Sequence, residues 1–549
     1  MEFDAVLLPA RRARMIEQGL WHDRTINDDL DACVAACPTK LALTASRVET
    51  GDVCRFSYRE LAQMADRIAV GLHRLGVRKN DVVACQLPNW WQFTLTYLAC
   101  SRIGAVINPL MHIFRERELG FMLKHGQAKV LITPRSFRGF DFEQMANSLQ
   151  RSIPEIKQLV IVDGEGPNSF EALLSGPAWE QEPDAAEILS ASRPGPDDVT
   201  QVIFTSGTTG EPKGVMHTAN TTMANIIPYA QRLHLDAETV VLMASPMAHQ
   251  TGFMYGLMMP IMLKAGVVLQ DVWEPRKAIQ VIRDEQVSFT MASTPFLTDL
   301  TRTVAEDATP VPSLKLFLCA GAPIPSALVE QARAVLGSKI VSAWGMTENG
   351  AVTTTLLEDD DERAFTTDGR PLPGVEVKVV DVDGKTLPPG QAGSLMLRSC
   401  SNFGGYLRRP HLNGTDAEDW FDTGDLARID EQGYIRITGR SKDVIIRGGE
   451  NIPVVEIENL LYRHPAVLQA AVISYPDERM GERACAVVVL KAGQRLDLPA
   501  LVEYFKGHKV AMQYIPERLE ILDAMPSTPS GKIQKFKLRE QLKSQFAAA

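Results

Sequence analysis

A glycine- and hydroxyl-rich segment from Thr205 to Val215, TSGTTGEPKGV, follows the apolar stretch TQVIF. Its glycines allow backbone N–H groups to turn inward, while its hydroxyls and Lys213 add donors and a positive charge. This combination suits a polyphosphate. It is not a Walker A loop, because Lys213 is followed by Gly214 and not by Ser or Thr. A flexible polar surface turn is the alternative. The candidate ligands are Thr205, Ser206, Gly207, Thr208, Thr209, Gly210 and Lys213.

Four further segments carry residues suited to phosphate, ribose and metal chemistry. They are CAGAPIP (319–325), AWGMTE (343–348), DTGD (422–425) with GRSKDVIIRGGENI (439–452), and PSTPSGKIQK (526–535). With the first segment, in this order and spacing, the chain resembles the adenylate-forming superfamily of acyl-CoA synthetases, peptide-synthetase adenylation domains and beetle luciferases. The resemblance covers essentially the whole chain, and it implies a carboxylic acid activated with ATP as an acyl-AMP.

The resemblance assigns the adenylation chemistry to a few residues. Glu348 matches the family's Mg²⁺ ligand, a hard oxygen donor, and Thr347 matches its α-phosphate hydroxyl. Lys532 matches the catalytic lysine, whose ammonium stabilises the charge that builds between the attacking carboxylate and the α-phosphate. Without the family context, Glu348 would be a solvated surface acid and Lys532 a mobile tail lysine.

The nucleotide site follows from the same resemblance. Asp425 matches the ribose ligand, since a carboxylate accepts hydrogen bonds from both hydroxyls, and Arg440 matches a second ribose contact. Trp344 stands where the family commonly has a stacking Tyr, while Cys319 and Ala320 replace its first glycines. A core Trp and a turn-forming Asp are the alternatives. The full set expected around ATP adds Gly321, Ala322, Pro323, Gly345, Met346 and Thr347.

A second half-reaction, displacement of AMP by the thiol of coenzyme A, needs a different arrangement. Lys442 matches the family's hinge position, about which a small C-terminal domain rotates. Gly448 and Gly449 match the loop that lines the pantetheine tunnel, where a side chain would block the thiol.

The acid itself is expected to bind near His249. Amino-acid-activating relatives have an Asp there, and a neutral imidazole cannot hold a substrate ammonium. The stretch that follows, Gly252 to Leu263, is apolar and rich in methionine, so it predicts an uncharged, apolar acyl group. A plain core histidine and core methionines are the alternatives.

The composition of the chain argues against several classes of binding partner and structural site. The 57 basic and 67 acidic residues give a net charge of −10 without a basic tract, which argues against nucleic acid. The apolar stretch Gly252 to Leu263 is shorter than the roughly 20 residues of a membrane span. No membrane span and a cytoplasmic location are expected. The cysteines form no CxxC pair, which disfavours a zinc or disulfide framework.

The elements that must position these residues alternate in type. Phe56 to Val77 predicts a helix, with a Ser57 cap, Glu60 three residues on and Gly76 at its end. Apolar strands follow at residues 81–89, then in GAVINPL, KVLITP and QLVIVDG, which indicates an α/β fold with helix-covered sheets. We expect a large N-terminal AMP-binding domain over residues 1–439 and a small mobile α+β domain over residues 440–549.

Together these features predict an ATP- and Mg²⁺-dependent acyl-CoA synthetase, similar to ligases for short- or medium-chain fatty acids and cyclohexanecarboxylate. Two alternatives stay open: delivery of the acyl group to a carrier protein, and a non-catalytic ligand-binding relative. Because acetylation would remove the positive charge of Lys532, this residue is also a candidate substrate of a protein lysine acetyltransferase. The sequence leaves the oligomeric state open, with a homodimer as one possibility.

Overall fold

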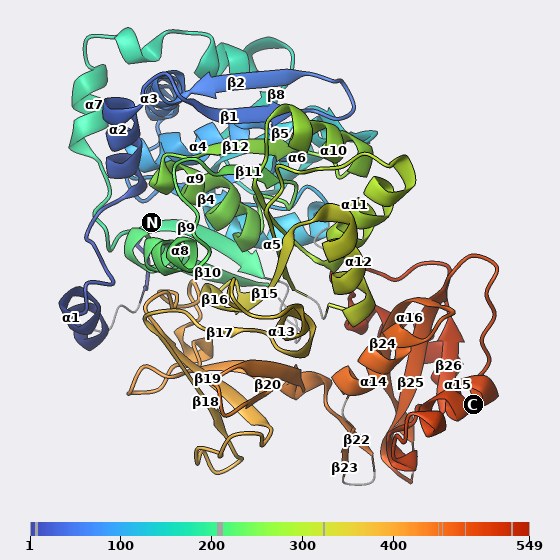
Figure 1. Cartoon of the computed structure of the whole chain (residues 1–549). Helices are drawn as coiled ribbons and strands as arrows, with labels where there is room; N and C mark the ends of the chain where they lie inside the picture. Colours follow the sequence, from blue (N-terminus) through green and yellow to red (C-terminus); the bar gives the residue numbers. More distant parts are fainter. Residues whose placement is uncertain are drawn as a thin grey trace.

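The computed structural model describes residues 2–5, 9–205, 212–321, 324–447, 450–452, 454–477, 479–528 and 531–547. Among them, the two largest sheets lie in the N-terminal part of the chain (Figure 1). One has nine strands, in the order β17 (Arg370–Pro371), β16 (Gly350–Thr354), β15 (Lys339–Met346), β14 (Leu316–Ala320), β13 (Phe289–Ala292), β11 (Val240–Met243), β12 (Gly266–Gln270), β1 (Leu41–Ser46) and β2 (Val53–Ser57). The other has six, in the order β10 (Lys213–Thr218), β9 (Val199–Thr205), β4 (Val106–Pro109), β3 (Val82–Cys85), β5 (Ala128–Pro134) and β8 (Gln158–Val162).

Three smaller sheets complete the described part. Four antiparallel strands follow the large body: β18 (Val375–Val380), β19 (Gly393–Ser399), β20 (Phe421–Ile429) and β21 (Ile435–Arg440). The last sheet contains β23 (Glu450–Ile452), β22 (Ile445–Arg447), β25 (Gly481–Leu490), β24 (Val467–Asp477) and β26 (Arg518–Ile521). A two-stranded ribbon pairs β6 (Ser136–Phe137) with β7 (Phe140–Asp141). The predicted boundary between residues 439 and 440 falls at the end of β21, and the division into domains there stays a prediction.

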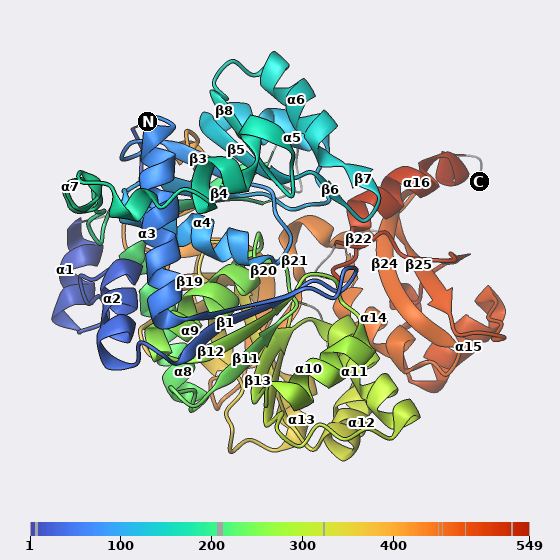
Figure 2. The same ribbon diagram turned by 90° about the horizontal axis from the view of Figure 1, so that it is seen from above.

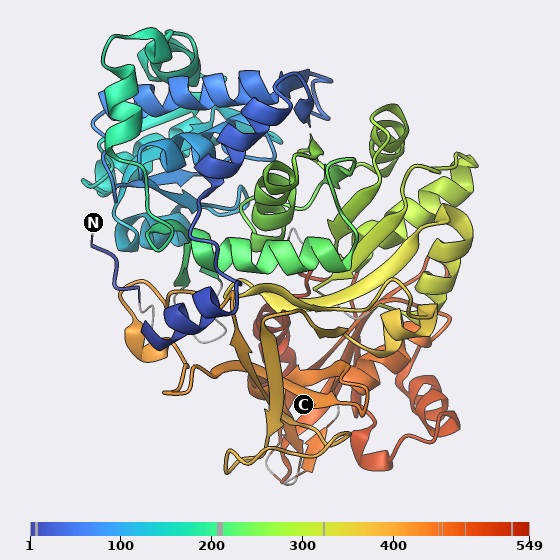
Figure 3. The same cartoon turned by 60° about the vertical axis from the view of Figure 1, so that its left-hand side comes forward.

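Helices cover the sheets as the alternating sequence pattern requires. Figure 2 shows α10 and α11 beside strands β11 and β13 of the nine-stranded sheet, and Figure 3 shows the green helix α8 crossing the middle of the molecule. The α-helices are α1 (Pro9–Glu17), α2 (Ile26–Ala36), α3 (Tyr58–Arg74), α4 (Trp91–Arg102), α5 (Glu116–His125), α6 (Phe142–Ser152), α7 (Ala185–Ala191), α8 (Ala219–Arg232), α9 (Met259–Leu263), α10 (Pro275–Asp284), α11 (Thr294–Asp307), α12 (Ser326–Leu336), α13 (Asp361–Thr366), α14 (Val454–Arg463), α15 (Leu498–Gly507) and α16 (Lys535–Ala547). None of the helices that the structure describes has the length and hydropathy needed to cross a bilayer.

The elements expected from the sequence form where predicted. Helix α3 begins after Ser57, whose hydroxyl accepts from the Glu60 N–H, while the Glu60 carboxylate accepts from the Ser57 N–H at 2.8 Å. The chain leaves this helix through Gly76, at a φ of 88°. The predicted strands become β3, β4, β5 and β8, which pair in parallel. The predicted α/β class is therefore confirmed.

A buried ion pair ties α1 to the loop before β20. Arg11 Nε lies 2.9 and 3.0 Å from the two carboxylate oxygens of Asp419, and both residues are 3% exposed. Arg11 Nη1 also donates to the carbonyls of Asn402 and Phe403. These contacts hold the loop that leads to the site described below.

We expect Arg11→Ala to lower the free energy of unfolding by about 3 kcal/mol, because it leaves a buried carboxylate with fewer partners. The neighbouring Arg12 also pairs with acids, Asp23 and Asp197, but its side chain is 40% exposed. Arg12→Ala is therefore the matched control and should cost less than ~1 kcal/mol. Urea denaturation of both variants measures the difference, and equal losses would contradict the assigned role of the Arg11 pair.

Candidate active site

The phosphate-binding candidates lie on the hairpin formed by β9 and β10. Thr205 at the end of β9 is paired with Lys213 at the start of β10. The Lys213 Nζ lies 4.1 Å from the centre of the Tyr406 ring. The candidates between them, Ser206, Gly207, Thr208, Thr209 and Gly210, lie outside the described residues. Four candidates from other segments also lie outside them: Ala322, Pro323, Gly448 and Gly449.

Glu348 lies in the turn between β15 and β16 and is 5% exposed. The Tyr406 hydroxyl donates to Glu348 Oε1 at 2.6 Å, and the Phe403 N–H donates to the Glu348 carbonyl at 2.8 Å. Burial and the neighbouring carboxylate raise the pKa of Tyr406 well above its usual range, so the hydroxyl keeps its proton. Tyr406 was not predicted from the sequence, because nothing in its local segment, GGYL, indicates that its hydroxyl contacts Glu348.

Thr347 is held through its main chain by a second residue that sequence reasoning missed. His217 Nε2 lies 2.8 Å from the Thr347 carbonyl oxygen, and its Nδ1 lies 3.0 Å from Thr221 Oγ1. Burial lowers the pKa of His217 to about 4, so the ring is neutral at pH 7. A neutral ring with Nε2 protonated donates to the carbonyl and fixes the turn that presents Thr347 and Glu348.

Asp425, on β20, is 3% exposed, and a donor from a different strand holds each of its carboxylate oxygens. Arg440 Nε on β21 lies 2.8 Å from Oδ1, and Trp344 Nε1 on β15 donates to Oδ2 at 3.0 Å. The structure thus brings together three residues predicted around the nucleotide. It places the Trp344 indole against Asp425, a contact that the sequence did not indicate.

Lys532 lies in a tight turn after β26. The Thr528 N–H donates to the Lys532 carbonyl at 2.8 Å, and Gly531 has a φ of 79°. A Cβ at Gly531 would lie 2.7 Å from Pro295 Cγ, so the turn contacts the start of α11 in the large body. Pro529 and Ser530 lie outside the described residues.

Two of the charged residues that influence Lys532, Arg440 and Asp425, are the residues predicted to bind the ribose. Arg440, together with partial loss of water, lowers the pKa of Lys532 to about 8, while Asp425 and Asp443 act to raise it. The residue still reaches solvent, which screens part of this effect. The ammonium is therefore the main form at pH 7. Lys532 thus lies within electrostatic reach of Asp425 and Arg440, although it is more than 90 residues farther along the chain.

His249 follows β11 and lies in the same electrostatic environment. Burial, aided by the positive charge of Lys532, lowers the pKa of His249 to about 4. Its Nδ1 accepts from the Thr251 N–H at 3.3 Å. The imidazole is neutral at pH 7, as the sequence-based argument about the acid assumed.

The methionine-rich stretch after His249 forms a π-helix, η4 (Gly252–Met258), that continues into α9. All residues of η4 are buried. Met254 reaches the strand after Glu348, because its Cε would lie 3.1 Å from a Cβ at Gly350. The ring centre of Phe253 lies 4.7 Å from that of Tyr97 on α4. The side chains of Phe253 and Met254 belong to the same buried apolar cluster, and Met254 is the one that approaches the strand after Glu348.

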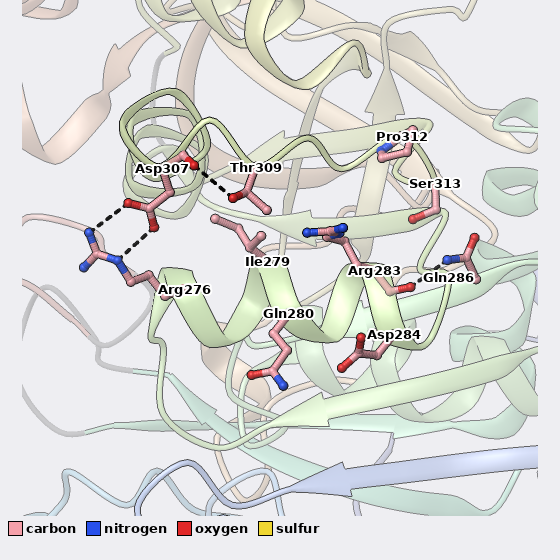
Figure 4. Close-up of a pocket in the computed structure, with 10 residues that line it drawn as sticks. All are labelled: Arg276, Ile279, Gln280, Arg283, Asp284, Gln286, Asp307, Thr309, Pro312 and Ser313. Atoms are coloured by element: carbon pink, nitrogen blue, oxygen red, sulfur yellow. Dashed lines mark hydrogen bonds and ion pairs between the residues drawn. The ribbon is translucent and has the colours of Figure 1, made fainter.

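A surface depression of about 510 Å³ lies on α10 and the loop before β14 (Figure 4). Arg276 and Asp307 form an ion pair at its edge. None of the predicted site residues lines it.

The hinge candidate Lys442 lies in a 3₁₀ turn, η6 (Ser441–Asp443), between β21 and β22. Ser441 Oγ donates to the Gly424 carbonyl at 3.1 Å, which ties it to β20. Asp443 pairs with Arg539 on α16 at 2.8 Å. Lys442 thus separates a residue bound to the four-stranded sheet from one bound to the last helix. Its role as a hinge stays a prediction.

Protein-family models match two parts of the chain. The family model described as AMP-binding enzyme matches residues 30–407, and the AMP-binding enzyme C-terminal domain matches residues 456–532. The chain is 37% identical to a medium-chain fatty-acid–CoA ligase of Escherichia coli K12, covering 97% of this chain and 93% of that protein. It is 31% identical to enterobactin synthase component E of the same organism, covering 98% of each.

Among solved structures, the ATP-bound crystal structure of MatB from Rhodopseudomonas palustris superimposes with a TM-score of 0.82 at 26% identity, covering 95% of this chain and all of that one. Its likeness confirms the predicted adenylate-forming fold, with a large N-terminal and a small C-terminal part. The chain therefore belongs to the AMP-binding enzyme family, as an AMP-forming acid–thiol ligase of the adenylate-forming superfamily.

Proposed function

We propose that this enzyme is an ATP- and Mg²⁺-dependent acyl-CoA synthetase that acts on a medium-chain fatty acid or an alicyclic acid such as cyclohexanecarboxylate. The observation that carries the proposal is the position of Lys532, within electrostatic reach of Arg440, Asp425 and His249. An ammonium there can serve a carboxylate that attacks the α-phosphate of a nucleotide held by Asp425. The similarity to a medium-chain fatty-acid–CoA ligase supports the acyl class.

The donor set at Glu348 fits Mg²⁺. Within the described part of the chain, no group of three or more His, Cys, Asp or Glu side chains could hold a metal on its own. Mg²⁺ is commonly bound by one or two carboxylates together with substrate phosphates, and a single buried Glu348 matches that pattern. Tyr406 uses Oε1 of this carboxylate, which has a second oxygen. When bound, the ion would neutralise charge on the phosphates.

The residues of the chain then have separate tasks in adenylation. Asp425 binds the ribose, and Tyr406 keeps Glu348 in one orientation. Lys532 stabilises the charge that develops while a bond forms between the acyl carboxylate oxygen and the α-phosphorus and the bond to the leaving pyrophosphate breaks. In the second step the thiol of CoA displaces AMP, which needs the rotation assigned to Lys442. Acetylation of Lys532 would remove its positive charge and stop the first step.

We expect hexanoate, octanoate and cyclohexanecarboxylate to give a higher kcat/KM than acetate, palmitate or any α-amino acid. The buried stretch from Gly252 to Met258 contains no acid or base to pair a second charge, and Met254 can adapt to rings or short chains. A panel of acids assayed with ATP and CoA measures the preference. Preference for an amino acid, a dicarboxylate, an aryl acid or acetate would refute this acyl class without affecting the ligase assignment.

Consumption of free CoA thiol tests the reaction itself. An acyl-CoA synthetase converts acid, ATP and CoA into thioester, AMP and pyrophosphate in equal amounts. An enzyme that serves a carrier protein would form acyl-AMP and leave the CoA thiol titre unchanged. A non-catalytic relative would release no pyrophosphate with any acid.

A further inference from the structure

Trp344 is a buried residue at the junction of two sheets. It lies on β15 of the nine-stranded sheet and is 9% exposed. Its ring belongs to an apolar cluster with Val352 on the neighbouring strand and with Leu395, Ala427 and Ile435 of the four-stranded sheet. The indole is therefore packed against residues of both sheets, which restricts the direction of its N–H.

That N–H points at Asp425. Trp344 Nε1 donates to Oδ2 at 3.0 Å, while Arg440 Nε holds Oδ1 at 2.8 Å. The Asp425 N–H also donates to Thr423 Oγ1 at 3.1 Å, which fixes the main chain below the carboxylate. A carboxylate has about four acceptor positions, so two remain, and their directions are set by the two fixed donors.

We propose that Trp344 is a positioning residue for ribose recognition, which holds the Asp425 carboxylate in the rotation that presents its remaining acceptor positions to the ribose hydroxyls. The inference rests on the proposed role of Asp425 as the ribose ligand. Without the indole N–H, the carboxylate can turn about its last side-chain bond and must be ordered when the nucleotide binds. A phenyl ring or an aliphatic side chain cannot replace the donor, since neither carries a polar hydrogen.

The effect should be confined to the ribose hydroxyls. If Trp344 acts on Asp425, its loss weakens binding of ATP much more than binding of an analogue that lacks one ribose hydroxyl. If Trp344 contributes packing alone, ATP and the deoxy analogues lose affinity equally. The ratio of the two dissociation constants therefore separates positioning from a structural role.

The experiment measures the dissociation constants of ATP, 2′-deoxy-ATP and 3′-deoxy-ATP by titration calorimetry with the full chain and Mg²⁺. We compare the unmodified protein with Trp344→Phe and Trp344→Leu, two variants that lose the N–H and keep an apolar side chain at this position. Trp90→Phe is the matched control, because the Trp90 Nε1 also donates to a carboxylate, that of Asp271 at 2.9 Å, and Trp90 is 4% exposed.

In the unmodified protein we expect ATP to bind roughly 10- to 100-fold more tightly than at least one deoxy analogue, as for hydrogen bonds to a charged group. In both Trp344 variants this ratio should fall about tenfold, and in Trp90→Phe it should stay unchanged. An unchanged ratio in whichever Trp344 variant folds would overturn the inference. If the unmodified protein binds all three nucleotides equally, the ribose role of Asp425 fails, and the inference fails with it.

Discussion

Lys532→Ala is expected to abolish formation of acyl-AMP while leaving thioester formation from supplied acyl-AMP largely intact. The ammonium acts on charge that develops only when the carboxylate attacks the α-phosphate. Removing one preorganised charge of this kind typically lowers the rate by roughly 100- to 1000-fold. Acid-dependent exchange of pyrophosphate into ATP, at pH 7 where Lys532 is charged, measures the first step, and release of AMP from synthetic acyl-AMP with CoA measures the second.

Lys537 offers the matched control for this variant. It lies five residues after Lys532, on the exposed side of α16, and its Nζ is 6.0 Å from the centre of the Phe536 ring. Lys537→Ala removes the same charge from the same end of the chain, and both half-reactions should continue at nearly the normal rate. Equal loss of both half-reactions in Lys532→Ala would show that the lysine supports the fold or the second step, and not adenylation alone.

The sequence located the reacting residues better than their partners. Glu348, Asp425, Arg440 and Lys532 are recognisable because each lies in a short segment of defined residue types. Their hydrogen-bond partners come from distant segments: Tyr406 is 58 residues from Glu348, and Trp344 is 81 residues from Asp425. Neither pairing follows from spacing along the chain, since each depends on how distant segments are placed in the fold.

Local signals predicted regular elements and missed an irregular one. Ser57 with Glu60 marked the start of α3, because capping depends on residues three apart. The π-helix η4 has no comparable local signal, because a short apolar run is compatible with both a buried helix and a buried strand. Its glycines allow close packing: a Cβ at Gly256 would lie 2.3 Å from Met243 Cγ. Such contacts with a distant strand are visible only in the folded chain.

Lys442→Pro is expected to leave acid-dependent pyrophosphate exchange largely intact while blocking transfer of the acyl group to CoA. Lys532 already lies within electrostatic reach of Asp425, the proposed ribose ligand, so we expect adenylation to need no rotation about residue 442. The second step does, and proline restricts φ to about −65° in the short link between Ser441, tied to β20, and Asp443, tied to α16. When the attacking thiol is misplaced relative to the acyl group, the rate of acyl transfer is expected to fall by about 100-fold.

The same two assays that separate the half-reactions of Lys532→Ala apply here, with the opposite expected result. Lys442→Ala is the control, because it removes the same side chain and keeps the backbone free to turn, so it should support both steps. If Lys442→Pro forms thioester from acyl-AMP at the normal rate, residue 442 is not the hinge. If it loses pyrophosphate exchange as well, proline has displaced the Lys532 turn itself, and the link between Arg440 and Asp443 serves adenylation as a fixed support.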